Sequence, residues 1–199
     1  MKLNTLMCAI VIAAVCTMAA AQDYPKAEVS VGYSYLMQNT EITALTPFLL
    51  SGDVAKLPLG GLNGGDAAVT FNLNSVLGIK ADFSGYTQSG PFATSGKVFD
   101  FAAGPVLKKH SGAFNPFAEL LVGVAHKSVS GFSLSGGENA FTAIVGGGVD
   151  FKLSQHFSVR AAEVDYVWTA YHTVNPTDFL NVSARQNNFR EVSGIVFTF

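Results

Sequence analysis

Charged side chains recur at alternate positions within several apolar stretches of this 199-residue sequence. In a β-strand, alternate side chains point to the same face of the sheet, so these residues would share one face. Charges enclosed there must pair or be hydrated, because burying an isolated charge costs several kcal/mol. We therefore predict an interior network of ion pairs and hydrogen bonds, with a gated path for protons or small ions as the alternative. The predicted members are Glu28, Lys80, Asp82, Asp100, Glu119, Arg160, Glu163, Asp165 and Arg190.

A second candidate site consists of His126, Ser128 and Glu138. His126 and Ser128 would share a strand face, and a histidine can activate a serine hydroxyl as a nucleophile. The pattern resembles the His-x-Ser motif and acidic residue of outer-membrane lipid A deacylases, a resemblance that implies cleavage of an acyl ester. The flanking sequence lacks the context of those enzymes, so we name no catalytic residue and do not expect an enzyme. A lipid-modifying outer-membrane enzyme stays as an alternative.

No cofactor or metal is predicted. Gly146–Gly148 is followed by a strand rather than a helix, so it fits close strand packing and not a phosphate-binding loop. The four histidines lie on different predicted elements, at spacings that form no recognisable metal site: His110, His126, His156 and His172.

The elements that would position these residues are strands, because apolar and small or polar residues alternate along them. One strand breaks its alternation: Arg160 and the pair Glu163 and Asp165 share a face only if one extra residue is inserted near Ala161-Ala162 as a β-bulge. In another strand Phe117 falls on the interior side, for no reason that the sequence provides. The eight predicted strands are 27–35, 66–74, 76–87, 96–107, 116–127, 139–151, 157–169 and 189–199.

The connections between these strands alternate between long and short. Segments 36–65 and 170–188 are long, and residues 128–138 read as a Ser/Gly loop. Long outer loops with short periplasmic turns are typical of outer-membrane barrels, and strands of about 9–11 residues cross a bilayer when tilted.

The last strand is apolar on one face, where Ile195, Phe197 and Phe199 lie at alternate positions. An apolar edge strand invites aggregation in water, whereas a closed barrel pairs both of its edges and turns its apolar face to lipid. A terminal Phe preceded by alternating apolar residues also resembles the closing strand of bacterial outer-membrane barrels. That resemblance implies that these three residues are the signal read by the barrel-assembly machinery.

Residues 1–21 are predicted to be a secretory signal peptide, with Lys2, an apolar run too short to span a bilayer, and Ala19-Ala20-Ala21 before the cleavage point. Both cysteines lie within it, so the domain 22–199 has no thiol or disulfide. Hydrophobic residues make up 49% of the sequence and charged residues only 13%, against about 25% charged in an average soluble domain. The net charge of −2 gives no basic footprint for nucleic acid.

With these strands in place, the chain resembles the eight-stranded outer-membrane β-barrels of the OmpA-like membrane-domain type. Members such as OmpA continue into a peptidoglycan-binding domain; since this sequence ends at Phe199, we expect no such domain and no cell-wall tether. The resemblance is carried by VSVGYSYL at 29–36, LGIKADFSGYT at 77–87, AAGP at 102–105, NPFAELLVGVAH at 115–126, GGGVDFKLS at 147–154, VRAAEVDYVWT at 159–169 and NNFREVSGIVF at 187–197.

We therefore expect an all-β, eight-stranded antiparallel up-and-down transmembrane β-barrel in a bacterial outer membrane. Its predicted role is structural or surface-interacting and is carried by segments 36–65 and 170–188. Outer-membrane lipid, lipopolysaccharide and the assembly machinery are the expected partners of a monomer. A small gated pore is one alternative, and a soluble lipocalin-like carrier, which would need the reverse of this polarity, is another. The aromatic residues expected to face outward are Tyr33, Tyr35, Phe71, Phe83, Tyr166, Trp168, Phe197 and Phe199.

Overall fold

The computed structural model describes residues 24–38, 42–43, 61–89, 95–110, 112–131, 134–170, 181–182 and 185–199. The predicted signal peptide, residues 1–21, lies outside the described residues, as do most of the long segments 36–65 and 170–188.

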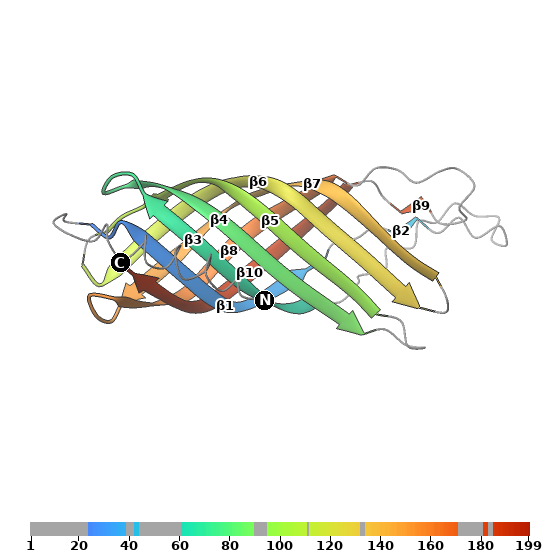
Figure 1. The fold of residues 1–199 in the computed structure, drawn as a ribbon, viewed down its shortest axis with the longest axis horizontal. Coiled ribbons are helices and arrows are strands. Elements are labelled where there is room, and N and C mark those ends of the chain that lie inside the picture. The colour runs from blue at the N-terminus through green and yellow to red at the C-terminus, as the bar shows by residue number, and fades with distance from the viewer. Residues whose placement is uncertain are drawn as a thin grey trace, which may run out of the picture.

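Eight long strands close into a barrel in the order β1-β10-β8-β7-β6-β5-β4-β3, and every neighbouring pair is antiparallel. In Figure 1 the strands run obliquely to the long axis of the molecule. This architecture confirms the predicted fold class. The strands are β1 (Ala27–Met37), β2 (Ile42–Thr43), β3 (Leu62–Asn72), β4 (Leu77–Ser89), β5 (Ser95–Lys108), β6 (Phe114–Gly131), β7 (Leu134–Lys152), β8 (Phe157–Ala170), β9 (Asn181–Val182) and β10 (Arg185–Thr198).

The two ends of the barrel differ. Residues 73–76, 109–113 and 153–156 connect strands at one end, which we call the turn end, and Phe199 also lies there (Figure 1). At the opposite, loop end, the short strands β2 and β9 pair with each other through Ile42 with Val182 and Thr43 with Asn181. The two long segments that follow β1 and β8 therefore meet beyond the barrel wall.

A β-bulge in β8 keeps its charged residues on one face. Val149 of β7 pairs with Ala162 and Asp150 with Arg160, so Ala161 is left over between them. The pairing of β8 with β10 shifts at the same place. The extra residue corrects the strand alternation, and Arg160 and Glu163 are both buried as the charge pattern predicts.

Several strands are longer than predicted, and the barrel strands have 11 to 19 residues. The expected loop 128–138 is wrong, because β6 and β7 stay paired through it, with Ser128 opposite Gly137. Serine and glycine have no strong strand preference, but a continuous ladder satisfies their backbone groups. For the same reason β10 begins at Arg185 rather than at residue 189, and β3 at Leu62 rather than at residue 66.

Apolar side chains are exposed on the outer face of every strand of the barrel, and Glu191 of β10 is a charged residue exposed among them. Of the aromatic residues expected there, Tyr35 and Trp168 are half-buried and the other six are exposed. An exposed apolar surface of this extent is stable in lipid and not in water. No helix among the described residues is long and apolar enough to cross a bilayer. Other exposed apolar side chains include Val31, Ile79, Phe101, Leu107, Leu120, Val122, Val124, Phe141, Val145, Val164 and Phe189.

Candidate functional site

All nine side chains predicted to face the interior are buried inside the barrel. Strand alternation brings them there from β1, β4, β5, β6, β8 and β10, so the site depends on closure of the sheet. An eight-stranded barrel is just wide enough for such side chains to fill it.

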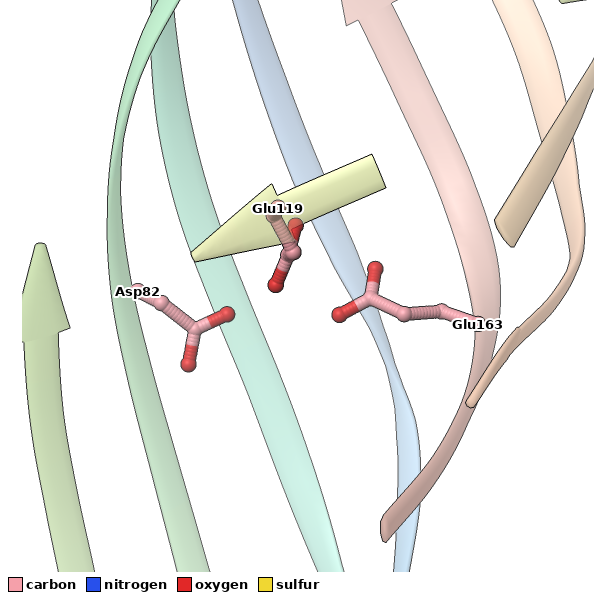
Figure 2. Close-up of side chains that lie close together, drawn as sticks. All are labelled: Asp82, Glu119 and Glu163. Carbon is pink, nitrogen blue, oxygen red and sulfur yellow. The ribbon is translucent and has the colours of Figure 1, made fainter. Parts of the chain in front are cut away.

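The Lys80 ammonium group is the centre of the first cluster. Its Nζ lies 2.9 Å from Glu119 Oε2, 3.0 Å from Glu163 Oε1 and 3.2 Å from Asp82 Oδ2. Figure 2 shows these three carboxylates directed toward one another, close enough to hold a metal ion. The ammonium already supplies the positive charge that a cation would bring, so we assign this cluster to ion pairing and not to metal binding.

The Arg190 guanidinium completes this cluster. Its Nε donates to Asp165 Oδ2 at 2.7 Å, and one terminal nitrogen donates to Asp82 Oδ1 at 2.8 Å and to Ser84 Oγ at 2.6 Å. The other terminal nitrogen lies 3.3 Å from Glu163 Oε1. Arginine suits this position because its planar group can bind several carboxylates at once.

A second cluster lies nearer the turn end, around Asp150. Lys108 Nζ lies 2.7 Å from Asp150 Oδ2 and also contacts Glu28. Arg160 Nε donates to Asp150 Oδ1 at 2.9 Å, and Arg160 also donates to Glu163 Oε2 at 2.6 Å. Since Glu163 accepts from Lys80 as well, it joins the two clusters into one network.

Phe117 packs among the cations of both clusters. Its ring centre lies 4.5 Å from Arg160 Cζ, 5.9 Å from Lys108 Nζ and 6.0 Å from Lys80 Nζ. The face of an aromatic ring attracts cations, which explains an aromatic side chain at an interior position. Gly148 on the neighbouring strand leaves room for it, because a Cβ there would lie 2.9 Å from Phe117 Cζ.

The network includes charged residues that the sequence analysis missed: Asp66, Lys108, His110 and Asp150. Asp150 and Asp66 have interior parity on their strands, so alternation could have identified both. Lys108 was assigned to a turn, but it is the last residue of β5. Carboxylates outnumber cations in this network, and Asp66 Oδ1 and Asp165 Oδ1 are buried without a hydrogen-bond partner among the described residues.

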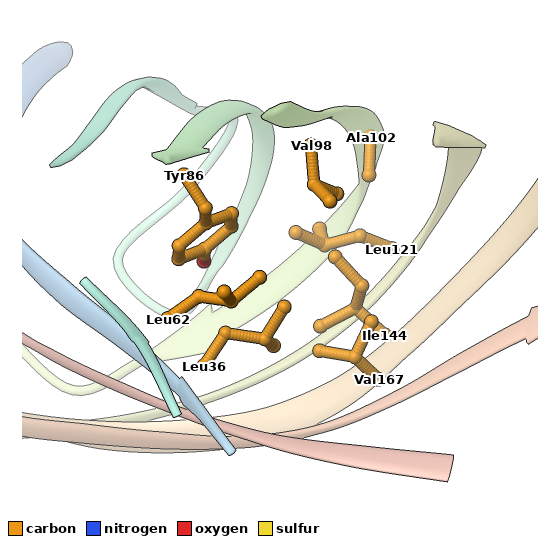
Figure 3. Close-up of a cluster of buried hydrophobic side chains, with 8 residues drawn as sticks. All are labelled: Leu36, Leu62, Tyr86, Val98, Ala102, Leu121, Ile144 and Val167. Atoms are coloured by element: carbon orange, nitrogen blue, oxygen red, sulfur yellow. The ribbon is translucent and has the colours of Figure 1, made fainter. Parts of the chain in front are cut away.

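A layer of apolar side chains fills the lumen toward the loop end, which the expectation of a polar interior did not include. Each member has the interior parity of its strand; Leu121, for example, is two residues from Glu119. Leu36 and Leu62 are cross-strand partners near the loop end. Figure 3 shows the side chains converging on the space that the ribbon encloses. They are Leu36, Leu62, Tyr86, Val98, Ala102, Leu121, Ile144 and Val167.

Comparison with known proteins supports this architecture. No protein-family model matches the sequence, and no curated protein matches it either. Solved structures do match. Ail, the attachment invasion locus protein of Yersinia pestis, is 14% identical over 88% of this chain and 99% of its own, with a TM-score of 0.56. Neisserial surface protein A is 12% identical over 89% and 100%, with a TM-score of 0.64.

The N-terminal β-barrel domain of OprF from Pseudomonas aeruginosa is 12% identical over 89% of this chain and 100% of its own, with a TM-score of 0.50. This chain has the fold of the eight-stranded outer-membrane β-barrels. The fold and the apolar exterior together confirm the predicted outer-membrane location. At these identities the likeness concerns the fold, so function must be argued from this barrel's own residues.

The structure of this outer-membrane barrel does not bring His126, Ser128 and Glu138 together as a catalytic triad. His126 and Ser128 occupy outward-facing positions of β6, and His126 Nδ1 lies 2.7 Å from Asn139 Oδ1. Glu138 is the cross-strand partner of Lys127, one residue out of phase, and therefore lies on the interior side. The geometry gives the deacylase alternative no support.

Proposed function

We propose that this outer-membrane barrel has a structural or surface-interaction role, carried by segments 36–65 and 170–188. The observation that supports this most is the filled lumen. The two ionic clusters fill much of the half toward the turn end, and the layer of apolar side chains lies toward the loop end. With the wall in lipid and the interior packed, the two ends are the surfaces left for a partner.

The pairing of β2 with β9 supports a joint role for the two long segments. Two backbone pairs, Ile42 with Val182 and Thr43 with Asn181, connect segments that are far apart in the sequence. A partner that contacts one segment would therefore also depend on the other. We propose that this loop end lies outside the cell, because long outer loops and short periplasmic turns are typical of outer-membrane barrels.

The composition of these segments indicates the kind of contact. Segment 36–65 contains Phe48, Leu49 and Leu50, and the two segments together have three carboxylates, one lysine, one arginine and one histidine. A second structure of Ail is a complex with the heparin analogue sucrose octasulfate. The segments of this chain carry no excess of basic residues. We therefore propose that their apolar and hydroxyl side chains contact the partner, and that the partner is not a sulfated polyanion.

A binding screen tests this role. Cells that display the full chain are compared with cells that display Val182→Pro, which removes a backbone donor from the β2–β9 pairing. The control replaces turn 153–156 at the opposite end with another tight turn. Ligands from a panel of glycans, matrix proteins and lipids should be lost with Val182→Pro and kept by the control. Equal binding by both variants would contradict a role for the joined segments.

A small gated pore is the alternative, and planar-bilayer recording separates it from this proposal. A packed lumen should give no stepwise conductance at moderate voltage. Reproducible unitary steps that change in Lys80→Met would instead favour an ion path through the network.

Biogenesis and lipid contacts belong to the same proposal. Phe197 and Phe199 are exposed on the outer face, and Phe197 packs edge-on against Phe157 at 5.6 Å between ring centres. We propose that Ile195, Phe197 and Phe199 are read by the barrel-assembly machinery, and that the folded monomer is surrounded by phospholipid and lipopolysaccharide. Phe199→Ser should slow assembly in cells, while Phe151→Ser, an outward aromatic on β7, should not.

A further inference from the structure

Beyond the packed ionic clusters, the mouth of the barrel at the turn end is open. A cavity of about 360 Å³ opens there, which we call the turn-end cavity. This volume is in the range of small-molecule sites, which begin at about 300 Å³. Its charged and titratable side chains are Tyr24, Lys26, Glu28, Lys108, His110, Lys152 and His156, and the last residue, Phe199, also lines it.

The carboxylate in this lining is already neutralised. Glu28 contacts Lys108, and its Oε1 lies 2.8 Å from His110 Nε2 and 2.9 Å from Asn72 Nδ2. Lys108 is in turn held by Glu28 and Asp150. These contacts form the floor of the cavity and leave little negative charge directed toward its opening.

Lys26 and Lys152 supply the remaining charge of the lining. Within the described ranges neither ammonium has a carboxylate at ion-pair distance, and the Lys26 ammonium lies 5.2 Å from the centre of the Tyr24 ring. The turns around the opening, residues 73–76, 109–113 and 153–156, contain no Asp or Glu. The side chains around the opening therefore carry a net positive charge, although the network inside the barrel carries an excess of carboxylates.

We propose that the turn-end cavity binds a phosphate group, carried either by a small soluble anion or by a lipid headgroup. Lys26 and Lys152 provide the charge, and Gln155, His156 and Ser158 provide further hydrogen-bonding groups on the same lining. Lysine ammonium groups are effective point-charge partners for phosphate. The small volume limits the ligand to one or two phosphate groups and does not admit a helical polyanion.

The test uses the folded full barrel in zwitterionic nanodiscs, titrated with inorganic phosphate and, at equal ionic strength, with chloride. Amide chemical shifts are followed by NMR. The test variant is Lys26→Gln/Lys152→Gln. The control, Lys97→Gln/Lys109→Gln, removes the same charge; Lys109 lies at the same end but does not line the cavity. Folding of both variants is verified by heat-modifiable gel migration.

We expect phosphate to shift amides of residues 24–28, 108–115 and 152–158, and the test variant to bind about tenfold more weakly while the control is unchanged. A second measurement uses nanodiscs that contain phosphatidylglycerol. If native mass spectrometry detects lipid that stays bound to the unmodified barrel but not to the Lys26→Gln/Lys152→Gln variant, the phosphate group belongs to a lipid headgroup. Equal weakening in both variants would show a diffuse charge effect and overturn the proposal. The proposal would also be overturned if the unmodified barrel bound neither inorganic phosphate nor phosphatidylglycerol.

Discussion

The guanidinium carbon of Arg160 lies 4.5 Å from the centre of the Phe117 ring, inside the barrel. The guanidinium donates in its plane to Asp150 and Glu163, which leaves its face to the ring. Lys80 and Lys108 approach the same ring from the two clusters. One aromatic ring therefore contacts three cations, on sides of those cations that make no ion pair with a carboxylate.

Phe117→Leu should lower the free energy of unfolding by about 1–2 kcal/mol, because it removes the cation–π contacts while keeping much of the apolar volume. Urea unfolding in lipid vesicles, followed by gel migration, measures the change. Phe101→Leu on the lipid-facing side is the control, and we expect an effect within about 0.5 kcal/mol. Equal effects of the two substitutions would mean that the ring does not interact with the cations.

Arg160→Met should destabilise the barrel by about 3 kcal/mol or more, because it leaves Asp150 and Glu163 as buried charges with one partner fewer. The same unfolding assay applies, with Lys97→Met on the exposed surface as the control. If the urea midpoint of Arg160→Met matched that of the unmodified barrel, the ion-pair account of the network would fail.

The excess of carboxylates predicts that two aspartates respond differently to neutralisation. Asp82 binds both Lys80 and Arg190, so Asp82→Asn should cost about 2 kcal/mol or more. Asp66 lies 3.5 Å from Arg190 and has a buried oxygen without a partner among the described residues, so Asp66→Asn should be neutral or stabilising. An equal loss of stability in both variants would show that carboxylate excess is unimportant.

Gly146 gives the Asp165 carboxylate its space. A Cβ at residue 146 would overlap Asp165 Oδ1 and approach Val164 O, so Gly146→Ala should disturb the Arg190 ion pair and lower stability by about 1–3 kcal/mol. Gly65 is a matched control, because a Cβ there would meet only Gly32 O at 3.8 Å. A Gly146→Ala barrel as stable as Gly65→Ala would refute the close packing at this position.

Strand alternation predicted the barrel, its polarity and the bulge at Ala161-Ala162, because side-chain direction in a strand depends on position alone. It failed where polar or small residues extend a ladder, as at Ser128 opposite Gly137. Pairs of this kind form because the adjacent strand offers hydrogen-bond partners, and the residue pattern of a single strand contains no information about its neighbour.

The apolar layer was also not predicted. Leu121 and Ile144 have the interior parity of their strands, but they are apolar where most interior positions are polar or small, and their contact with each other depends on how the strands close. Lys108 was missed because a turn was predicted where β5 continues. Sequence patterns therefore indicated which face most residues occupy, while their partners depend on the register of the closed sheet.

The central claim is that apolar side chains on the outer face meet lipid while their neighbours are enclosed. Leu120 and Leu121 test it without any substitution, since they are adjacent residues of one type, 54% and 0% exposed. In methyl-labelled protein in nanodiscs, we predict nuclear Overhauser effects from acyl-chain protons to the Leu120 methyls and none to the Leu121 methyls. Acyl-chain contacts at Leu121, with water contacts at Leu120, would contradict the account.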